Sequence, residues 1–115
     1  MTTATFPSEH DEQCGFVTWF RSKWPHVLIY AIPNGEKRAI STAKRLKMEG
    51  VVSGIPDLHI PEWQLWVEMK RTKGGRLSPE QKMMIQQLGV IGHQVIVGYG
   101  AKDASRQVLE FIARQ

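Results

Sequence analysis

The sequence has little cysteine and no long apolar run, and both features limit what kind of protein it can be. Cys14 is the only cysteine among 115 residues, which excludes an intramolecular disulfide and a zinc site built from several cysteines. No apolar segment reaches the roughly 18 residues that a membrane-spanning helix needs. The first residues, MTTATFPSEHDEQ, lack the basic and apolar regions of a secretion signal. We therefore expect a soluble, intracellular protein.

The composition favours one domain with a basic surface. Hydrophobic residues make up 42% of the chain, enough for the core of a single domain over residues 1–115. The net charge is +4, and the basic residues gather in two segments. The first contains Lys37, Arg38, Lys44, Arg45 and Lys47, and the second contains Lys70, Arg71, Lys73 and Arg76. Such clusters are often plain solvated surface, but they also favour an anionic partner such as nucleic acid.

The periodicity of apolar residues predicts an α/β fold with the order α-β-α-β-β-α-β-α. We expect helices at about residues 9–23, 41–48 and 79–90, and a last helix from about residue 103 or just before it. We expect strands at residues 26–32, 58–60, 63–70 and 93–100. Residues 61–62 would form the tight turn of a hairpin between the second and third strands.

The segment GIPDLHIPEWQLWVEMK places charges in an otherwise apolar hairpin. Side chains alternate between the two faces of a strand, so Glu68 and Lys70 share one face with Trp66, and the turn would bring Asp57 to the same edge. Two close carboxylates repel each other unless they share a proton or bind a divalent cation. Oxygen ligands suit Mg²⁺ or Mn²⁺, and a neighbouring lysine can orient an attacking water. Alternatively, Glu-x-Lys is a solvent-exposed ion pair of little consequence.

The spacing of these groups resembles a nuclease motif. Pro56-Asp57, a gap of ten residues and then Glu68-Met69-Lys70 are similar to the pattern of the PD-(D/E)XK nuclease superfamily. The segments SEHDEQ, NGEKR, LKMEGVVSGIPDL, WVEMKR, GGRLSPEQ and GHQVIVGYGAKDA occur in the order seen in the virus-type replication-repair nuclease (VRR-NUC) family. They cover nearly the whole chain. The resemblance implies a restriction-endonuclease-like core, in which helices flank a central mixed sheet and the active site lies where the hairpin strands part.

The resemblance also implies roles for individual residues. Asp57 and Glu68 would bind Mg²⁺ or Mn²⁺ together with the backbone carbonyl of Met69, and Lys70 would be the catalytic lysine. Gln81 resembles a glutamine that the family places near the active site. Gln81 has a second explanation, because Ser78 and Gln81 also fit a capping box that starts a helix at Pro79.

A further acid is expected on the first helix, and two residues could supply it. Glu9 is the preferred candidate, since it shares a helical face with Gln13. Glu12 is the alternative, on a neighbouring face with Phe16 and Trp19, and periodicity leaves the choice open. For either residue, an acid in the first turn of a helix needs no chemical role, because it interacts favourably with the helix dipole.

The expected function is metal-dependent hydrolysis of DNA. The resemblance implies a homodimer acting on branched DNA such as four-way junctions. The basic residues expected to contact phosphates are Lys44, Arg45, Lys47, Lys73 and Arg76. One alternative is a DNA-binding module that does not cut. Another is a sequence-specific restriction endonuclease, although 115 residues leave little room for a recognition subdomain.

Overall fold

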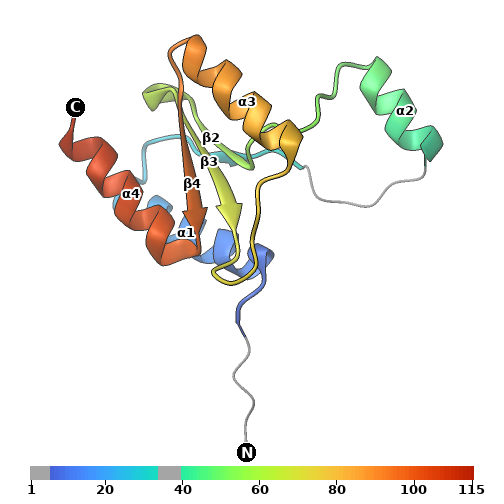
Figure 1. The fold of residues 1–115 in the computed structure, drawn as a ribbon. Helices are drawn as coiled ribbons and strands as arrows, with labels where there is room; N and C mark the ends of the chain where they lie inside the picture. The colour runs from blue at the N-terminus through green and yellow to red at the C-terminus, as the bar shows by residue number, and fades with distance from the viewer. Residues whose placement is uncertain (1–5, 34–39) are drawn as a thin grey trace, which may run out of the picture.

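The structure is a computed structural model that describes residues 6–33 and 40–115. The elements follow the predicted order, with one additional 3₁₀ turn, η1 (Figure 1). The helices are α1 (Glu9–Lys23), α2 (Ile40–Met48), α3 (Pro79–Val90) and α4 (Ala101–Ala113). The strands are β1 (Tyr30–Ala31), β2 (Leu58–Ile60), β3 (Leu65–Lys70) and β4 (Gln94–Tyr99), and η1 is Pro61–Trp63. Within the described ranges, no helix is long and apolar enough to cross a membrane.

The strands form one mixed sheet in the order β1-β2-β3-β4. β2 runs antiparallel to both β1 and β3, whereas β3 and β4 are parallel. The parallel pair needs a crossover connection, and α3 supplies it. The α/β architecture predicted from the sequence is therefore confirmed.

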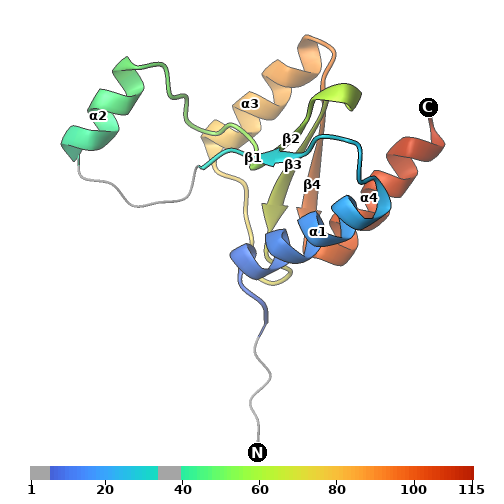
Figure 2. The ribbon, with the colours of Figure 1, turned by 180° about the vertical axis from the view of Figure 1, so that it is seen from behind.

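The core lies between the sheet and the pair of helices α1 and α4. Figures 1 and 2 show α1 and α4 together on one side of the sheet, with α3 on the other side. Leu65, Val67 and Met69 point toward α1 and α4 and are fully buried with Phe16 and Val108. Because strand side chains alternate, Trp66, Glu68 and Lys70 belong to the opposite face. The core therefore fixes which side of β3 carries the charged residues.

The helix starts follow from local sequence. Ser8 caps α1 by accepting a hydrogen bond from the backbone N–H of Asp11 at 3.0 Å. Ser78 caps α3, and Gln81 completes the predicted capping box. α2 is different, because none of its residues is buried and it lies apart from the sheet (Figure 1).

Several predicted boundaries were wrong. The strand expected at residues 26–32 is limited to β1, and β2 ends at Ile60, so no residue of β2 lies opposite residues 26–28. The expected tight turn at residues 61–62 is η1 followed by Gln64 in the left-handed conformation (φ 50°), so β3 begins at Leu65. α4 begins at Ala101, just before Asp103, which agrees with the prediction. Lys37 and Arg38 lie outside the described residues.

Candidate active site

Asp57 and Glu68 face each other where β2 and β3 meet. Leu58 pairs with Val67 in the antiparallel register, so Asp57 and Glu68 form the next pair outward. The Oδ2 atom of Asp57 accepts a hydrogen bond from the backbone N–H of Met69 at 2.8 Å. This bond fixes the Asp57 carboxylate against β3, beside the Glu68 side chain.

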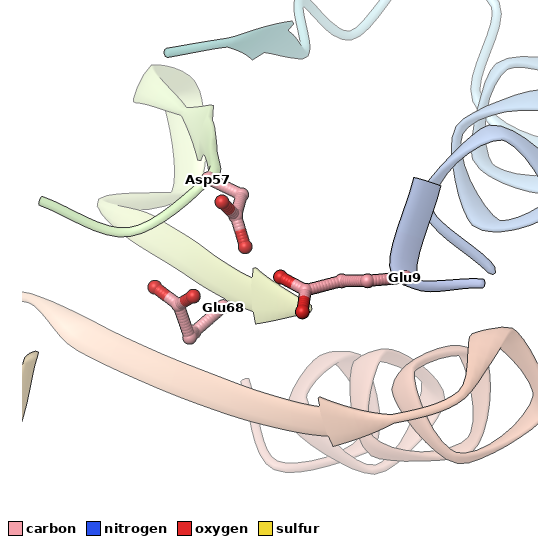
Figure 3. Close-up of side chains that lie close together, drawn as sticks. All are labelled: Glu9, Asp57 and Glu68. Carbon is pink, nitrogen blue, oxygen red and sulfur yellow. The ribbon is translucent and has the colours of Figure 1, made fainter. Parts of the chain in front are cut away.

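Glu9 brings a third carboxylate to the same point. It is the first residue of α1, and carboxylate oxygens of Glu9, Asp57 and Glu68 all lie within 4.8 Å of one another. Figure 3 shows the three side chains converging from α1, from the segment before β2 and from β3. Residues far apart in the sequence are thus combined into one acidic cluster.

Glu68 is the most enclosed member of the cluster. Only 1% of the residue is exposed, and its Oε1 accepts a hydrogen bond from Gln81 Nε2 at 3.1 Å. The Lys70 ammonium lies 3.9 Å from the same oxygen and is also buried. Burial, a hydrogen bond with Asp57 and the negative charges of Asp57 and Glu9 together raise the pKa of Glu68 to about 9, against the opposing effect of Lys70.

The pKa of Glu9 is raised as well. Burial is the main cause, and the negative charge of Asp57 adds to it, while Lys70 and Arg71 act in the opposite direction. Three carboxylates at this separation cannot all ionise without a compensating cation. Because every donor is a carboxylate oxygen, the cluster fits a hard divalent cation such as Mg²⁺ or Mn²⁺.

Gln81 has both of the roles that the sequence left open. Its Oε1 accepts the backbone N–H of Ser78 at 2.8 Å, which belongs to the capping box. Its Nε2 donates to Glu68 in the acidic cluster. One side chain therefore connects the start of α3 to the candidate site.

Glu12 lies away from the cluster that contains Glu9. Its two carboxylate oxygens accept hydrogen bonds from the hydroxyl of Thr72 at 2.9 Å and from the backbone N–H of Ala101 at 3.0 Å. Of the two candidates on the first helix, the structure brings Glu9 to Asp57 and Glu68.

The candidate DNA-binding residues fall in two separate places. Lys73 and Arg76 lie in the exposed segment between β3 and α3. Lys44, Arg45 and Lys47 lie on α2 (Figure 1), where Arg45 forms an ion pair with Glu49 at 3.4 Å. A groove of about 820 Å³ separates α2 from the start of α3, and both Lys47 and Gln81 line it. The groove thus leads from α2 to a residue that contacts the acidic cluster.

Gly54 allows the segment that carries Asp57 to approach α3 closely. This role was not predicted from the sequence. Gly54 has φ +85°, and a Cβ there would lie 2.5 Å from the backbone oxygen of Glu80. Only glycine allows this approach. The isolated Gly before Pro-Asp was the available signal, because such a glycine often marks a close backbone contact.

A row of aromatic rings beside the cluster was also missed. Tyr30, His59 and Trp66 are register partners across β1, β2 and β3. His59 stacks on Trp66 with ring centroids 3.8 Å apart, and Trp66 donates a hydrogen bond to His93 at 3.1 Å. Strand alternation places His59 on the face of Asp57, and this signal was present in the sequence.

Comparison with known proteins identifies the fold. No family model and no curated protein sequence matches the chain. Among solved structures, the chain is similar to a "VRR_NUC domain protein" with a TM-score of 0.78 and 21% identity, over 96% of this chain and 92% of that chain. The chain is therefore an α/β protein of the VRR-NUC fold. The fold implied by the sequence resemblance is confirmed over nearly the whole chain.

Proposed function

We propose that this protein belongs to the VRR-NUC family and is a divalent-metal-dependent nuclease that hydrolyses phosphodiester bonds in DNA. The observation that carries the proposal is the convergence of Glu9, Asp57 and Glu68 within 4.8 Å, with the Lys70 ammonium 3.9 Å from Glu68. The VRR-NUC fold supports it independently, and the motif residues lie side by side, Asp57 directly before β2 and Glu68 and Lys70 on β3.

Each side chain has a role in the proposed reaction. Asp57, Glu68 and Glu9 would hold Mg²⁺ or Mn²⁺, together with the backbone carbonyl of Met69. Bound there, the cation supplies Lewis-acid stabilisation and a more acidic water. Lys70 is held on β3 with its ammonium beside the carboxylates, where it orients the attacking water and offsets negative charge on the phosphate.

Gln81 and the Met69 N–H preserve the arrangement of the carboxylates. Gln81 restricts the Glu68 side chain by donating to Oε1, and the Met69 N–H restricts Asp57 by donating to Oδ2. These bonds leave the other carboxylate oxygens for a cation. The protein therefore presents a preorganised ligand set, which lowers the cost of reaching the reactive geometry.

The DNA would extend from the cluster across two basic regions. Lys73 and Arg76 would contact phosphates beside β3, and Lys44, Arg45 and Lys47 would do so from α2, along the groove that Gln81 lines. We further propose that the substrate is branched DNA such as a four-way junction and that the active form is a homodimer. Two symmetric sites can cut two strands of a symmetric junction.

A cleavage assay tests the proposal. The purified protein is incubated with a labelled four-way junction, a flap, plain duplex and single-stranded DNA, each with Mg²⁺, Mn²⁺ or EDTA. We expect cutting that requires the cation and is absent in Asp57→Ala, with paired symmetric nicks in the junction. Cutting of duplex at one fixed sequence would instead indicate a restriction endonuclease. Binding without cutting under every condition would contradict the nuclease and favour a DNA-binding module.

A further inference from the structure

Glu12 connects three segments that are distant in the sequence. Its own backbone belongs to α1, one helical turn after Glu9. Its Oε2 accepts the Thr72 hydroxyl, and its Oε1 accepts the backbone N–H of Ala101. These contacts span 60 and 89 residues of sequence. One carboxylate thus joins α1 to the turn after β3 and to the start of α4.

The segments that Glu12 joins also carry the end of the lysine strand. Lys70 is the last residue of β3, and Thr72 follows it by two positions. The carbonyl oxygen of Lys70 accepts the backbone N–H of Gly100 at 2.8 Å, directly before Ala101. The Lys70–Gly100 hydrogen bond joins the end of β3 to the start of α4. Because Thr72 and Ala101 both bind Glu12, each of these two segments is also hydrogen-bonded to α1.

The junction is closely packed around Gly100. This residue has φ +97°, and a Cβ there would lie 2.7 Å from Thr72 Oγ1 and 3.2 Å from Glu12 Oε2. Gly100 is also the N-cap of α4 and supplies no side-chain cap, so Glu12 provides an acceptor for the first helical N–H. A carboxylate is well suited to this position because the N-terminus of a helix carries partial positive charge.

We propose that Glu12 is a positioning residue of the nuclease site: by binding Thr72 and Ala101, it holds the Glu9 turn of α1 in register with the Lys70 end of β3. The proposal rests on the proposed function, since Glu9 and Lys70 are assigned there to the metal and to the water. Glu12 itself touches neither the acidic cluster nor, on this proposal, the DNA.

The geometry predicts different effects of two substitutions. Glu12→Ala removes both acceptors. Glu12→Gln keeps both bonds, because its amide oxygen can accept the Ala101 N–H while its NH₂ donates to the Thr72 hydroxyl, which can also act as an acceptor. Asp11→Ala is the matched control, because Asp11 is an exposed acid on the same turn of α1. Glu9→Gln is the comparison for loss of a metal ligand.

Steady-state cleavage with saturating Mn²⁺ gives the first test. Supporting residues around metal sites typically contribute 10-fold to 100-fold, so we expect Glu12→Ala to lower kcat about 10-fold with an unchanged KM for DNA. Glu12→Gln should restore the rate, and Asp11→Ala should leave it unchanged. A purely structural residue would lower Tm without changing kcat of the folded protein. That result, or a Glu12→Gln variant as slow as Glu12→Ala, would overturn the proposal.

A second measurement keeps the proposal separate from the proposed function. Amide hydrogen exchange at Ala101 and Gly100 and Mn²⁺ affinity by calorimetry are measured for the same variants. Faster exchange and weaker Mn²⁺ binding in Glu12→Ala, both restored in Glu12→Gln, would support positioning even if the wild-type protein cut no DNA. Unchanged exchange at both amides would overturn it even if the wild-type protein were an active nuclease.

Discussion

The buried carboxylate of Glu68 lies 3.9 Å from the ammonium of Lys70, on the same face of one strand. Both side chains are largely withdrawn from water, which is unfavourable for charged groups unless they are paired. Burying this acid and this base at one place in the sheet therefore lowers the stability of the fold. The earlier alternative, a solvent-exposed ion pair, is wrong, since neither side chain is exposed.

Replacing Lys70 should separate catalysis from binding. Lys70→Met keeps the apolar stem of the side chain and removes the charge. Because the ammonium is assigned to the water and the transition state, we expect kcat to fall by 10²-fold or more, roughly the range of a lost transition-state group. Mn²⁺ affinity and DNA affinity should change little. Calorimetry, gel shift and single-turnover cleavage measure the three quantities.

The control for Lys70→Met is Lys102→Met, an exposed lysine at the start of α4. It should behave as the wild type in all three assays. Full cleavage activity in Lys70→Met would remove Lys70 from the mechanism.

The stability of the metal-free protein should fall as pH rises. The pKa of Glu68 is raised to about 9 in the folded state, chiefly by burial, against an ordinary value of 4.5. The folded protein retains this proton while the unfolded chain has released it, so unfolding becomes easier as pH rises from about 4.5 through about 9. The charged groups that face Glu68 are Asp57, Lys70 and Glu9.

Thermal unfolding in EDTA across this range measures the effect. We expect Tm to decrease with pH in the wild-type protein and to decrease less in Glu68→Gln, which has no proton to release. Mn²⁺ should also reduce the slope, because the cation favours the ionised carboxylates. A wild-type Tm that rises with pH between these limits would contradict the raised pKa.

Two substitutions in α3 should separate capping from catalysis. Ser78→Ala removes the N-cap hydroxyl, which typically costs about 1 kcal/mol of stability, and leaves the bond from Gln81 to Glu68. Gln81→Ala keeps the bond from the backbone N–H of residue 81 to the Ser78 hydroxyl, but it removes both side-chain contacts of Gln81, to the Ser78 N–H and to Glu68. We therefore expect both variants to lose stability in urea unfolding, but only Gln81→Ala to lose kcat. If the two variants had equal kcat at a temperature where both are folded, Gln81 would act only in the capping box and not in catalysis.

Sequence reasoning succeeded where the determinants are local. The bounds of α1 and α3 agree with prediction because Ser8 and Ser78 cap the first turns of these helices. The grouping of Asp57 with Glu68 also followed from local rules, namely strand alternation and a short connection.

The features that the sequence predicted wrongly or left open depend on partners that are distant in the sequence. The length of β1 depends on the three residues of β2, which lie beyond α2. The choice between Glu9 and Glu12 depends on Thr72 and Ala101, because these residues occupy the carboxylate of Glu12. Helical periodicity contains no information about either contact.

The close approach of Gly54 to α3 should make this position intolerant of a side chain. In Gly54→Ala, the new Cβ would lie 2.5 Å from the oxygen of Glu80 at a φ of +85°, so we expect a loss of about 1–3 kcal/mol in urea unfolding. The strain should also displace Asp57, three residues later, and weaken Mn²⁺ binding. Gly89→Ala is the matched control: nothing lies within 4 Å of its Cβ, and alanine in a helix interior should stabilise α3 by about 0.5–1 kcal/mol. If Gly54→Ala were as stable as Gly89→Ala and bound Mn²⁺ normally, the contact with α3 would not be what holds the Asp57 segment in place.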